Sequence, residues 1–230
     1  MRLYLVRHAD PDYPRGTITA AGRLEAAALA ERLAGEKIDR LFSSPLGRAV
    51  HTAEYTAKRL GLAIEQEQWM SELNRLRLTA GPHAGLMAWD APGHLLRDGR
   101  AASDSLHPDI AEPDFQQEID RVRQDSDRFL AELGYVRQDG AYRVERTNRQ
   151  RLAAFCHGGL GLTWLAHLLS IPVTTMWSAF WLPPSSVTVV LLDERTAGLA
   201  TPRCLCLGDT SHLHAAGLPI QPSGIKANYD

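Results

Sequence analysis

The sequence predicts an α/β protein: a three-layer sandwich with a mostly parallel central sheet, helices on both faces and an inserted cap region. Short apolar runs of strand length alternate with longer amphipathic stretches, the order expected when a helix follows each parallel strand. A stretch at about 75–150 interrupts this alternation and is the predicted cap. The chain has 230 residues, 44% of them hydrophobic, which is enough for one core, so we expect a single domain over 1–230.

The first predicted unit is a strand over residues 3–6 followed by a helix over 19–35. The strand is a short apolar run that leads directly into Arg7. Thr19 is a suitable N-cap for the helix, apolar residues recur on one face, and Gly35 stands where the helix should end.

The second predicted unit begins with a strand over residues 41–43. Ser44 and Pro45 come next, a pattern typical of an N-cap followed by proline at the first helical position. We therefore expect a helix from Pro45 to just before Gly61, and a third strand over 63–67.

The remainder of the chain has one irregular stretch and several further elements. Residues 80–113 are rich in Gly, Pro, Asp and His, with weak periodicity, and predict little regular structure. A strongly amphipathic helix is expected over 114–134. The other predicted elements are a hairpin or loop over 135–151, a strand over 152–156, a helix up to 169, and late strands over 186–192 and 204–207.

Bulk composition excludes several classes of protein. The net charge of −2 gives no reason to expect a nucleic-acid or membrane partner. Cys156, Cys204 and Cys206 are odd in number and lack CxxC spacing, which favours reduced, packed thiols. No apolar stretch approaches the ~18 residues of a membrane span, and the N-terminal apolar run is too short for a signal peptide. We expect a cytoplasmic protein.

Cationic and titratable residues gather at three predicted strand-to-helix junctions: Arg7-His8, Arg48 and His157. In a parallel sheet these junctions share the carboxyl edge, where open α/β folds bind ligands. One core histidine is more often a hydrogen-bonded structural residue. Four such groups at one edge would be costly without an anion, and arginine binds phosphate in a bidentate manner. The set predicts a phosphate site.

Other chemistries fit these motifs less well. Cys156 before His157 suggests a thiol phosphatase, but such a loop needs an arginine about six residues on, where Leu162 stands. The run HGGLG lacks the Lys-Ser/Thr of a nucleotide-binding P-loop, and no GxSxG elbow is present. The arginines beside His8 and His157 would repel a cation. We therefore expect neither a metal nor a cofactor.

Five motifs resemble those of the histidine phosphatase superfamily, the phosphoglycerate-mutase-like proteins. LVRHADPDY is similar to the opening Arg-His motif, and ITAAGRLEAAALAERL to the first helix, with Glu25 where the family has Gln. LFSSPLGRAVHTAE, AFCHGG and LGDTSHL resemble the later motifs. Together they span about half the chain in the family's order.

The resemblance implies the roles of the phosphate-binding residues. His8 would attack phosphorus and become phosphohistidine. Arg7, Arg48 and His157 would hold the equatorial oxygens, with Gly158 beside them, and His157 would carry a proton when phosphate is bound. The two arginines also disfavour a protonated His8, which helps to keep it nucleophilic.

The resemblance also implies which residue is the general acid/base. It shows as well that one loop departs from the family pattern. Glu72 matches the family's proton donor, which protonates the leaving alkoxide and then activates water; Asp10 is a poorer candidate. The loop DPDYPRGTI lacks the Asn and Gln with which many members hold phosphate. Arg15 or Tyr13 would have to replace them.

The predicted function is a metal-independent histidine acid-type phosphatase acting on a small phosphate ester. Two alternatives remain open: a phosphoglycerate-type mutase, which the unrelated segment after Glu72 disfavours, and a non-catalytic protein that binds a phosphorylated ligand or a protein. A homodimer also remains open. In the cap, side chains that could face substrate are Arg75, Arg77, His83 and Trp89. The cluster Trp177, Phe180 and Trp181 is expected to be core or an oligomer contact.

Overall fold

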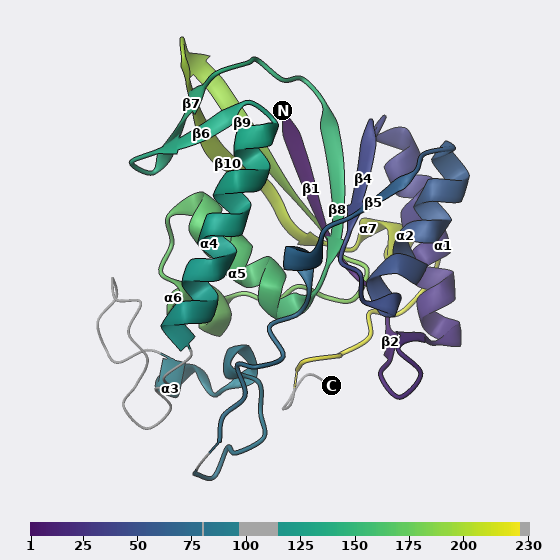
Figure 1. Cartoon of the computed structure of the whole chain (residues 1–230). Coiled ribbons are helices and arrows are strands. Elements are labelled where there is room, and N and C mark those ends of the chain that lie inside the picture. The colour runs from purple at the N-terminus through teal and green to yellow at the C-terminus, as the bar shows by residue number, and fades with distance from the viewer. Residues whose placement is uncertain (80, 97–114, 226–230) are drawn as a thin grey trace.

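A computed structural model describes residues 1–79, 81–96 and 115–225. The predicted α/β sandwich is confirmed: a central sheet lies between two groups of helices (Figure 1). Among the described helices, none combines the length and the apolar composition required to cross a bilayer. Most of the irregular stretch predicted over 80–113, namely residue 80 and residues 97–113, lies outside the described residues.

The central sheet has eight strands in the order β5-β4-β8-β1-β9-β10-β7-β6. Strands β5, β4, β8 and β1 run parallel, and the pairs from β1 through β9, β10 and β7 to β6 are antiparallel. The bounds are β1 Arg2–Arg7, β4 Arg40–Ser43, β5 Ile64–Gln66, β6 Tyr135–Gln138, β7 Ala141–Val144, β8 Arg151–Cys156, β9 Val187–Thr196 and β10 Leu199–Asp209. A separate two-stranded ribbon pairs β2 (Pro11–Asp12) with β3 (Thr17–Ile18).

Each face of the sheet has its own apolar core. In β1, Leu3 and Leu5 pack with residues of α4, α5 and α6, whereas Tyr4 and Val6 pack with residues of α1 and α2. This alternation follows from the two-residue period of a strand. The helices are α1 Ala20–Gly35, α2 Gly47–Leu60, α3 Gly93–Leu96, α4 Phe115–Glu132, α5 Gly158–Leu169, α6 Val173–Ala179 and α7 Ser211–Ala215, with 3-10 turns η1 Gln68–Met70 and η2 Ala88–Asp90.

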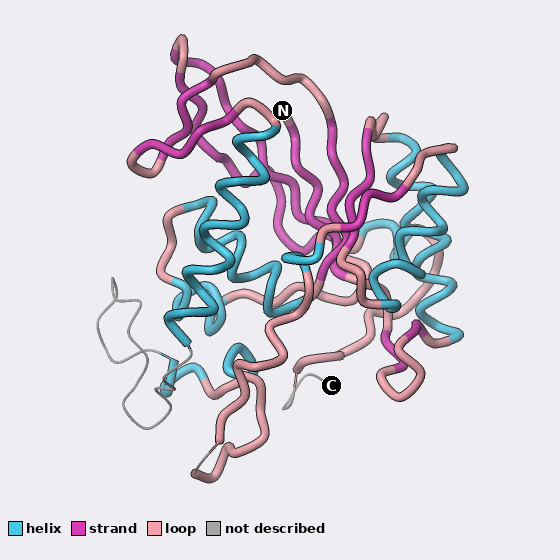
Figure 2. The backbone as a smooth tube through the Cα atoms, in the orientation of Figure 1, coloured by secondary structure: helices cyan, strands magenta, loops and turns pink. Residues whose placement is uncertain are grey.

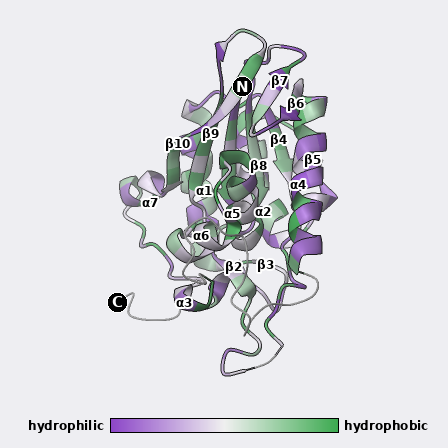
Figure 3. Ribbon diagram, turned by 90° about the vertical axis from the view of Figure 1, so that its left-hand side faces the viewer, coloured by the Kyte–Doolittle hydropathy of each residue, from purple (hydrophilic) through white to green (hydrophobic). Residues whose placement is uncertain are grey.

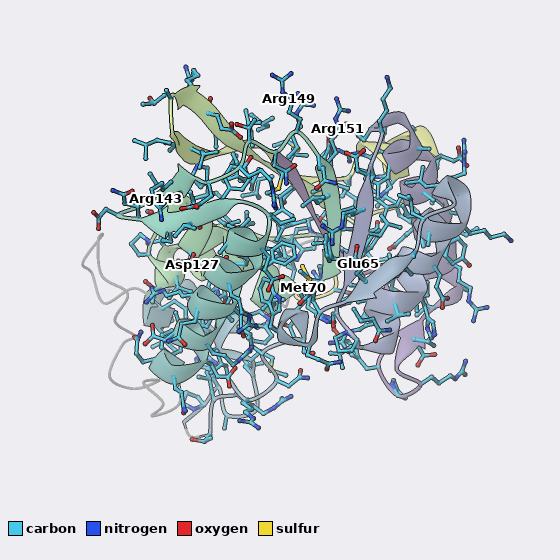
Figure 4. All side chains as sticks on the ribbon, turned by 45° about the horizontal axis from the view of Figure 1, so that its top comes forward. Glu65, Met70, Asp127, Arg143, Arg149 and Arg151 are labelled. Carbon is cyan, nitrogen blue, oxygen red and sulfur yellow. The ribbon has the colours of Figure 1, made fainter. Side chains whose placement is uncertain are left out.

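Burial explains why these helices differ in composition. Helix α5 is apolar almost throughout, since nine of its twelve residues are buried. Helix α4 buries one face and carries charged residues on the other, so both colours alternate along it in Figure 3. Figure 4 places Met70 within the molecule, and its side chain is fully buried in the core on the α4–α5 side.

Two antiparallel hairpins extend the sheet further than the sequence predicted. The sequence predicts a hairpin or a loop over 135–151, and the first part of this region is the hairpin β6–β7 at the end of the sheet. This part of the predicted cap region therefore belongs to the main sheet. Strands β9 and β10 are also longer than expected: β9 continues through the charged residues Asp193, Glu194 and Arg195 to Thr196, and β10 begins already at Leu199.

The two edges of the parallel strands differ in character. Arg149 and Arg151 project from the amino edge in Figure 4; Arg149 is exposed, whereas Arg151 is partly buried and donates to Glu36 O. At the carboxyl edge the strands end in loops that lead into α2 and α5 (Figure 2). Residues 68–79, 81–96 and 222–225 lie at this second edge, which holds the candidate site (Figure 1).

Candidate active site

The backbones of Arg7 and His8 are held from both sides at the end of β1. His8 N donates to Cys156 O of β8 at 2.9 Å, and His8 O accepts from Ser185 N at 3.1 Å. Arg7 N donates to Ser186 O at 3.1 Å. Because these hydrogen bonds fix the backbone of both residues, the positions of their Cβ atoms are well defined. A site that must position reacting groups needs such rigidity.

The hydrogen bonds of His8 define its tautomer. Nδ1 lies 2.8 Å from the carbonyl oxygen of Ala9, and Arg48 Nε donates to Nε2 at 3.2 Å. A guanidinium has no acceptor, so Nε2 must hold the lone pair and Nδ1 the proton. Burial, followed by the charges of Arg7 and Arg48, lowers the pKa of His8 well below its ordinary value. The ring is neutral, with Nε2 and its lone pair towards Arg48.

His157 lies beside His8, at the residue before α5. The two ring centroids are 5.2 Å apart, and His157 Nε2 lies 2.8 Å from the hydroxyl oxygen of Ser44. Its Nδ1 is buried and has no hydrogen-bond partner within the described chain. Burial, and then the charges of His8, Arg48 and Arg7, lower the pKa of His157 well below its ordinary value. Its neutral form therefore prevails in this structure.

Arg7 is 7% exposed, and its guanidinium is only partly satisfied by the protein. One terminal nitrogen donates to Leu182 O at 2.5 Å and to Ser223 O at 3.1 Å. Its Nε is buried without a partner in the described ranges. A Cβ on Gly158 would lie 3.5 Å from Nε, so the first turn of α5 closely approaches this donor. An unpaired buried donor beside a helix N-terminus is suited to an anion.

Glu72 receives backbone N–H groups from two segments. Oε1 accepts from Leu73 N at 3.0 Å and Leu160 N at 2.8 Å, and Oε2 accepts from Gly159 N at 3.2 Å. These bonds favour the ionised carboxylate, but burial is the larger effect and raises the pKa of Glu72. The carboxyl thus holds its proton to a higher pH than an exposed glutamate.

Arg7, Arg48, Glu72 and Gly158 line a cavity of about 890 Å³, and we call its part at these residues the phosphate end. His8 and His157 are buried and do not themselves line the cavity, but Arg48, which does, donates to His8 Nε2. Four large aromatic residues also line the cavity: Trp89, Trp177, Phe180 and Trp181. Trp181 lies close to Arg7, because both side chains donate to Ser223 O. In the described parts of the chain, no three His, Cys, Asp or Glu side chains are grouped so as to hold a metal ion.

A family model for the histidine phosphatase superfamily, branch 1, matches residues 3–203. The chain belongs to that superfamily.

Solved structures of histidine phosphatase superfamily type resemble this chain in fold. A phosphoserine phosphatase from Entamoeba histolytica, in complex with 3-phosphoglyceric acid, has a TM-score of 0.63 and 19% identity over 92% of this chain and 98% of that one. A mycobacterial glucosyl-3-phosphoglycerate phosphatase has a TM-score of 0.60 and 23% identity over 90% and 98%. No curated protein sequence matches this chain significantly.

The structure brings the predicted site residues of this superfamily member together, with one exception. Arg7, His8, Arg48, His157 and Glu72 meet at the carboxyl edge, with Gly158 beside them. The side chain of Arg15 instead is 82% exposed and pairs with Asp12 at 3.5 Å. It does not line the cavity. The alternative residue for this loop, Tyr13, does line it, and the guanidinium carbon of Arg48 lies 5.4 Å from its ring centroid.

Several residues that organise the site were not singled out by the sequence. Ser44, read as an N-cap, binds His157, and α2 begins three residues later at Gly47. Thr52 accepts from Ala9 N at 3.0 Å and donates to Arg48 O at 2.7 Å, which ties the nucleophile loop to α2. The sequence offered one indication of these roles, namely that Ser44 and Thr52 both lie in the motif LFSSPLGRAVHTAE.

A buried carboxyl lies behind the phosphate end. Glu25 is 2% exposed, and its Oε2 accepts from Asp10 N at 2.9 Å. Burial raises the pKa of Glu25 to about 6. Asp10 itself bonds the hydroxyls of Thr19 at 2.7 Å and Ser223 at 3.1 Å. Both carboxyls thus brace the loop after His8 from behind.

Two further expectations concern side chains near the site. Cys156 is buried, and burial raises the pKa of its thiol to about 12, so it is no thiolate nucleophile. Trp177 is buried core, as expected, and it lines the cavity together with Phe180 and Trp181; that the trio forms an oligomer contact stays a prediction.

Proposed function

We propose that this protein is a phosphomonoester hydrolase that acts on small phosphorylated metabolites through a phosphohistidine at His8 and needs no metal. The protonation pattern of His8 carries the proposal. Its proton is on Nδ1, bound to Ala9 O, and its lone pair is on Nε2 beside Arg48. A neutral imidazole with a fixed tautomer is the form that can attack phosphorus.

In the first step, the lone pair of His8 Nε2 forms a bond to phosphorus. The bond to the ester oxygen breaks, and its electron pair leaves with that oxygen. Arg48 passes its hydrogen bond from Nε2 to a phosphoryl oxygen as the attack proceeds. The unpaired donor of Arg7 holds a second oxygen. This places positive charge where the transition state spreads its negative charge.

His157 completes the cluster around the phosphoryl group. Its Nδ1 is buried without a partner among the described residues and can serve a third oxygen. A bound dianion opposes the burial and cationic neighbours that lower its pKa, and so favours its protonated form. Proton uptake by His157 is therefore coupled to phosphate binding.

Glu72 handles the proton in both steps. Its raised pKa keeps the carboxyl available as an acid that protonates the leaving oxygen. In the second step the resulting carboxylate takes a proton from water while the water oxygen attacks phosphorus. The phosphorus–Nε2 bond then breaks, its electron pair returns to His8, and phosphate is released.

The test is a panel of phosphomonoesters assayed with EDTA, followed by rapid acid-free quenching to detect phosphohistidine. We expect turnover that EDTA leaves unchanged and a labelled His8 in the wild-type protein. His8→Ala should lower kcat by roughly a thousandfold or more and remove the label. His214→Ala, at an exposed histidine of α7, is the matched control and should retain activity.

Other outcomes would contradict parts of this proposal. Loss of activity in EDTA would contradict the metal-free route. Phosphate binding with no phosphohistidine and no turnover would indicate a non-catalytic protein. A phosphoenzyme that transfers its group to added 3-phosphoglycerate faster than to water would indicate a mutase.

A further inference from the structure

We infer that the leaving-group end of the cavity selects an uncharged leaving group that carries an aromatic ring, and disfavours one that carries a carboxylate. This inference rests on the proposed phosphatase function and adds the substrate class. Four features support it: the aromatic walls, their support from the core, the position of Trp89 next to Glu72, and the charges around that end.

The walls of this end are aromatic, and part of their surface is open. Trp89 on η2 and Phe180 and Trp181 after α6 all line the cavity. Phe180 is 38% exposed and so ranks among the exposed large apolar residues of the described chain. Exposed aromatic surface in a concave site commonly binds an apolar ligand. A ring entering here would meet aromatic faces and edges.

These walls are supported by the core, so the shape of the pocket is set before a ligand binds. The centroids of Trp89 and buried Trp177 are 6.1 Å apart, with their planes at 74°. Trp177 also contacts Phe115 edge-to-face at 5.3 Å, and its indole N–H donates to Thr163 at 3.0 Å. A preformed pocket loses little conformational freedom when a ring binds.

Trp89 lies directly beside the proton donor. A Cβ on Gly159 would come within 2.5 Å of the indole Cδ2 of Trp89, so the indole packs on the first turn of α5. The N–H of that same glycine donates to Glu72. A leaving oxygen that receives the proton of Glu72 must lie near this carboxyl. The group attached to it therefore meets Trp89 first.

The charges around this end oppose a second anion. Asp90 lines the cavity, and its charge raises the pKa of Arg7. Glu72 also lines it but carries a proton when the ester binds, so it does not offset the charge of Asp90. Apart from Arg7 and Arg48 at the phosphate end, Arg77 is the one cation among the described lining residues, and it donates to Gly85 O. A carboxylate-bearing leaving group would thus meet the negative charge of Asp90.

The experiment compares kcat/KM for benzyl phosphate, ethyl phosphate, 3-phosphoglycerate and glucose 6-phosphate in EDTA. All four release alkoxides rather than phenoxides, so intrinsic reactivity does not favour the aromatic ester. We expect benzyl phosphate to exceed ethyl phosphate by roughly tenfold to a hundredfold, because the ring is buried against apolar surface. We expect 3-phosphoglycerate and glucose 6-phosphate to fall below benzyl phosphate.

The outcomes separate this inference from the proposed function. Turnover of none of the four esters would overturn the proposed function. Equal turnover of all four would leave that function standing and overturn only the aromatic selectivity. A rate for 3-phosphoglycerate or glucose 6-phosphate that matches or exceeds the benzyl rate would also overturn it, in favour of a charged or sugar leaving group.

A variant locates the selectivity in the aromatic wall. Phe180→Ala should lower the ratio of the benzyl to the ethyl kcat/KM by several-fold, and Phe180→Tyr should largely retain it. Leu205→Ala is the matched control, since Leu205 lies on β10 at 49% exposure and does not line the cavity. A ratio unchanged in both Phe180→Ala and Trp89→Leu would contradict the assignment.

Discussion

The two ends of the cavity are built in different ways. The phosphate end uses residues at the ends of β1 and β8 and in the first turns of α2 and α5, so the central sheet positions it. The leaving-group end uses η2 and the segment after α6, which are short or irregular stretches far apart in the sequence. Ser223 O joins the two ends, because it accepts from both Arg7 and Trp181. The common chemistry is thus mounted on rigid elements, and the selectivity is assembled from loops.

A substitution of Glu72 is the strongest test of this difference between the two ends. Glu72 comes from an irregular segment, yet its proposed role is in the chemistry at the phosphate end. Glu72→Gln should lower kcat/KM for ethyl phosphate by on the order of a hundredfold. The loss should be much smaller with p-nitrophenyl phosphate, whose leaving group needs no proton. Steady-state assays of both esters provide the measurement, and equal losses would mean that Glu72 supports structure instead.

The pH profile provides a second readout for the same residue. The acid form of Glu72 is the active form in transfer to His8, so kcat/KM for ethyl phosphate should fall as pH rises through its raised pKa. Glu72→Gln should lack that decline. A wild-type profile that stays flat from pH 5 to about 9 would contradict the acid role.

Gly159 joins the two ends, and its substitution should produce an intermediate effect. The added Cβ of Gly159→Ala would overlap the indole of Trp89, which must then shift. We expect kcat/KM for benzyl phosphate to fall about tenfold, and kcat/KM for ethyl phosphate to fall by a smaller factor. The substitution should also lower the free energy of unfolding by about 1–3 kcal/mol. Gly35→Ala is the control, because a Cβ there has no neighbour within 4 Å. An equal loss of kcat/KM for both esters would mean that Trp89 does not contribute to the selectivity for an aromatic leaving group.

Glu25, which is buried behind the phosphate end, tests whether this end lowers the stability of the fold. Of the predicted effects, its effect is the smallest. Its folded-state pKa of about 6 lies above the ordinary glutamate value of 4.5, so the folded state binds the proton more tightly than the unfolded state does. Its ionised form therefore costs stability above pH 6, and this cost is relieved as pH falls towards 4.5.

Glu25→Gln should accordingly stabilise the protein at pH 7 by on the order of 1 kcal/mol and give no advantage at pH 4.5. Urea unfolding at the two pH values is the measurement. Glu54→Gln, at an exposed position of α2, provides a control. A variant that is less stable than the wild type at pH 7 would mean that the charge of Glu25 is favourable.

The sequence predicted the phosphate end well, because its residues occupy local landmarks. Arg7, His8 and His157 follow buried strands, and Arg48 lies in a first helical turn, where side chains lean back towards the strand ends. Hydrophobic periodicity locates such positions. It also predicted most strands and helices of the sandwich.

The leaving-group end was less predictable, because its contacts join segments without periodicity. Phe180 and Trp181 have the composition of core residues, and local spacing does not reveal that they reach a cavity wall shared with Trp89. Ser44 was misread for a related reason: its hydroxyl fits an N-cap pattern, but the histidine that it binds lies 113 residues away. Arg15 was predicted to bind phosphate in place of the Asn and Gln that many family members have in this loop. In the structure its side chain is exposed and pairs with Asp12 instead.

The hydrogen bond between Arg7 and Ser223 has a consequence for the order of folding. The two residues are 216 positions apart, so this contact closes a very long loop of the chain. Closing a long loop costs conformational entropy before the contact contributes any stability. We therefore expect the surroundings of Arg7 to be completed late in folding, after the more local contacts have formed.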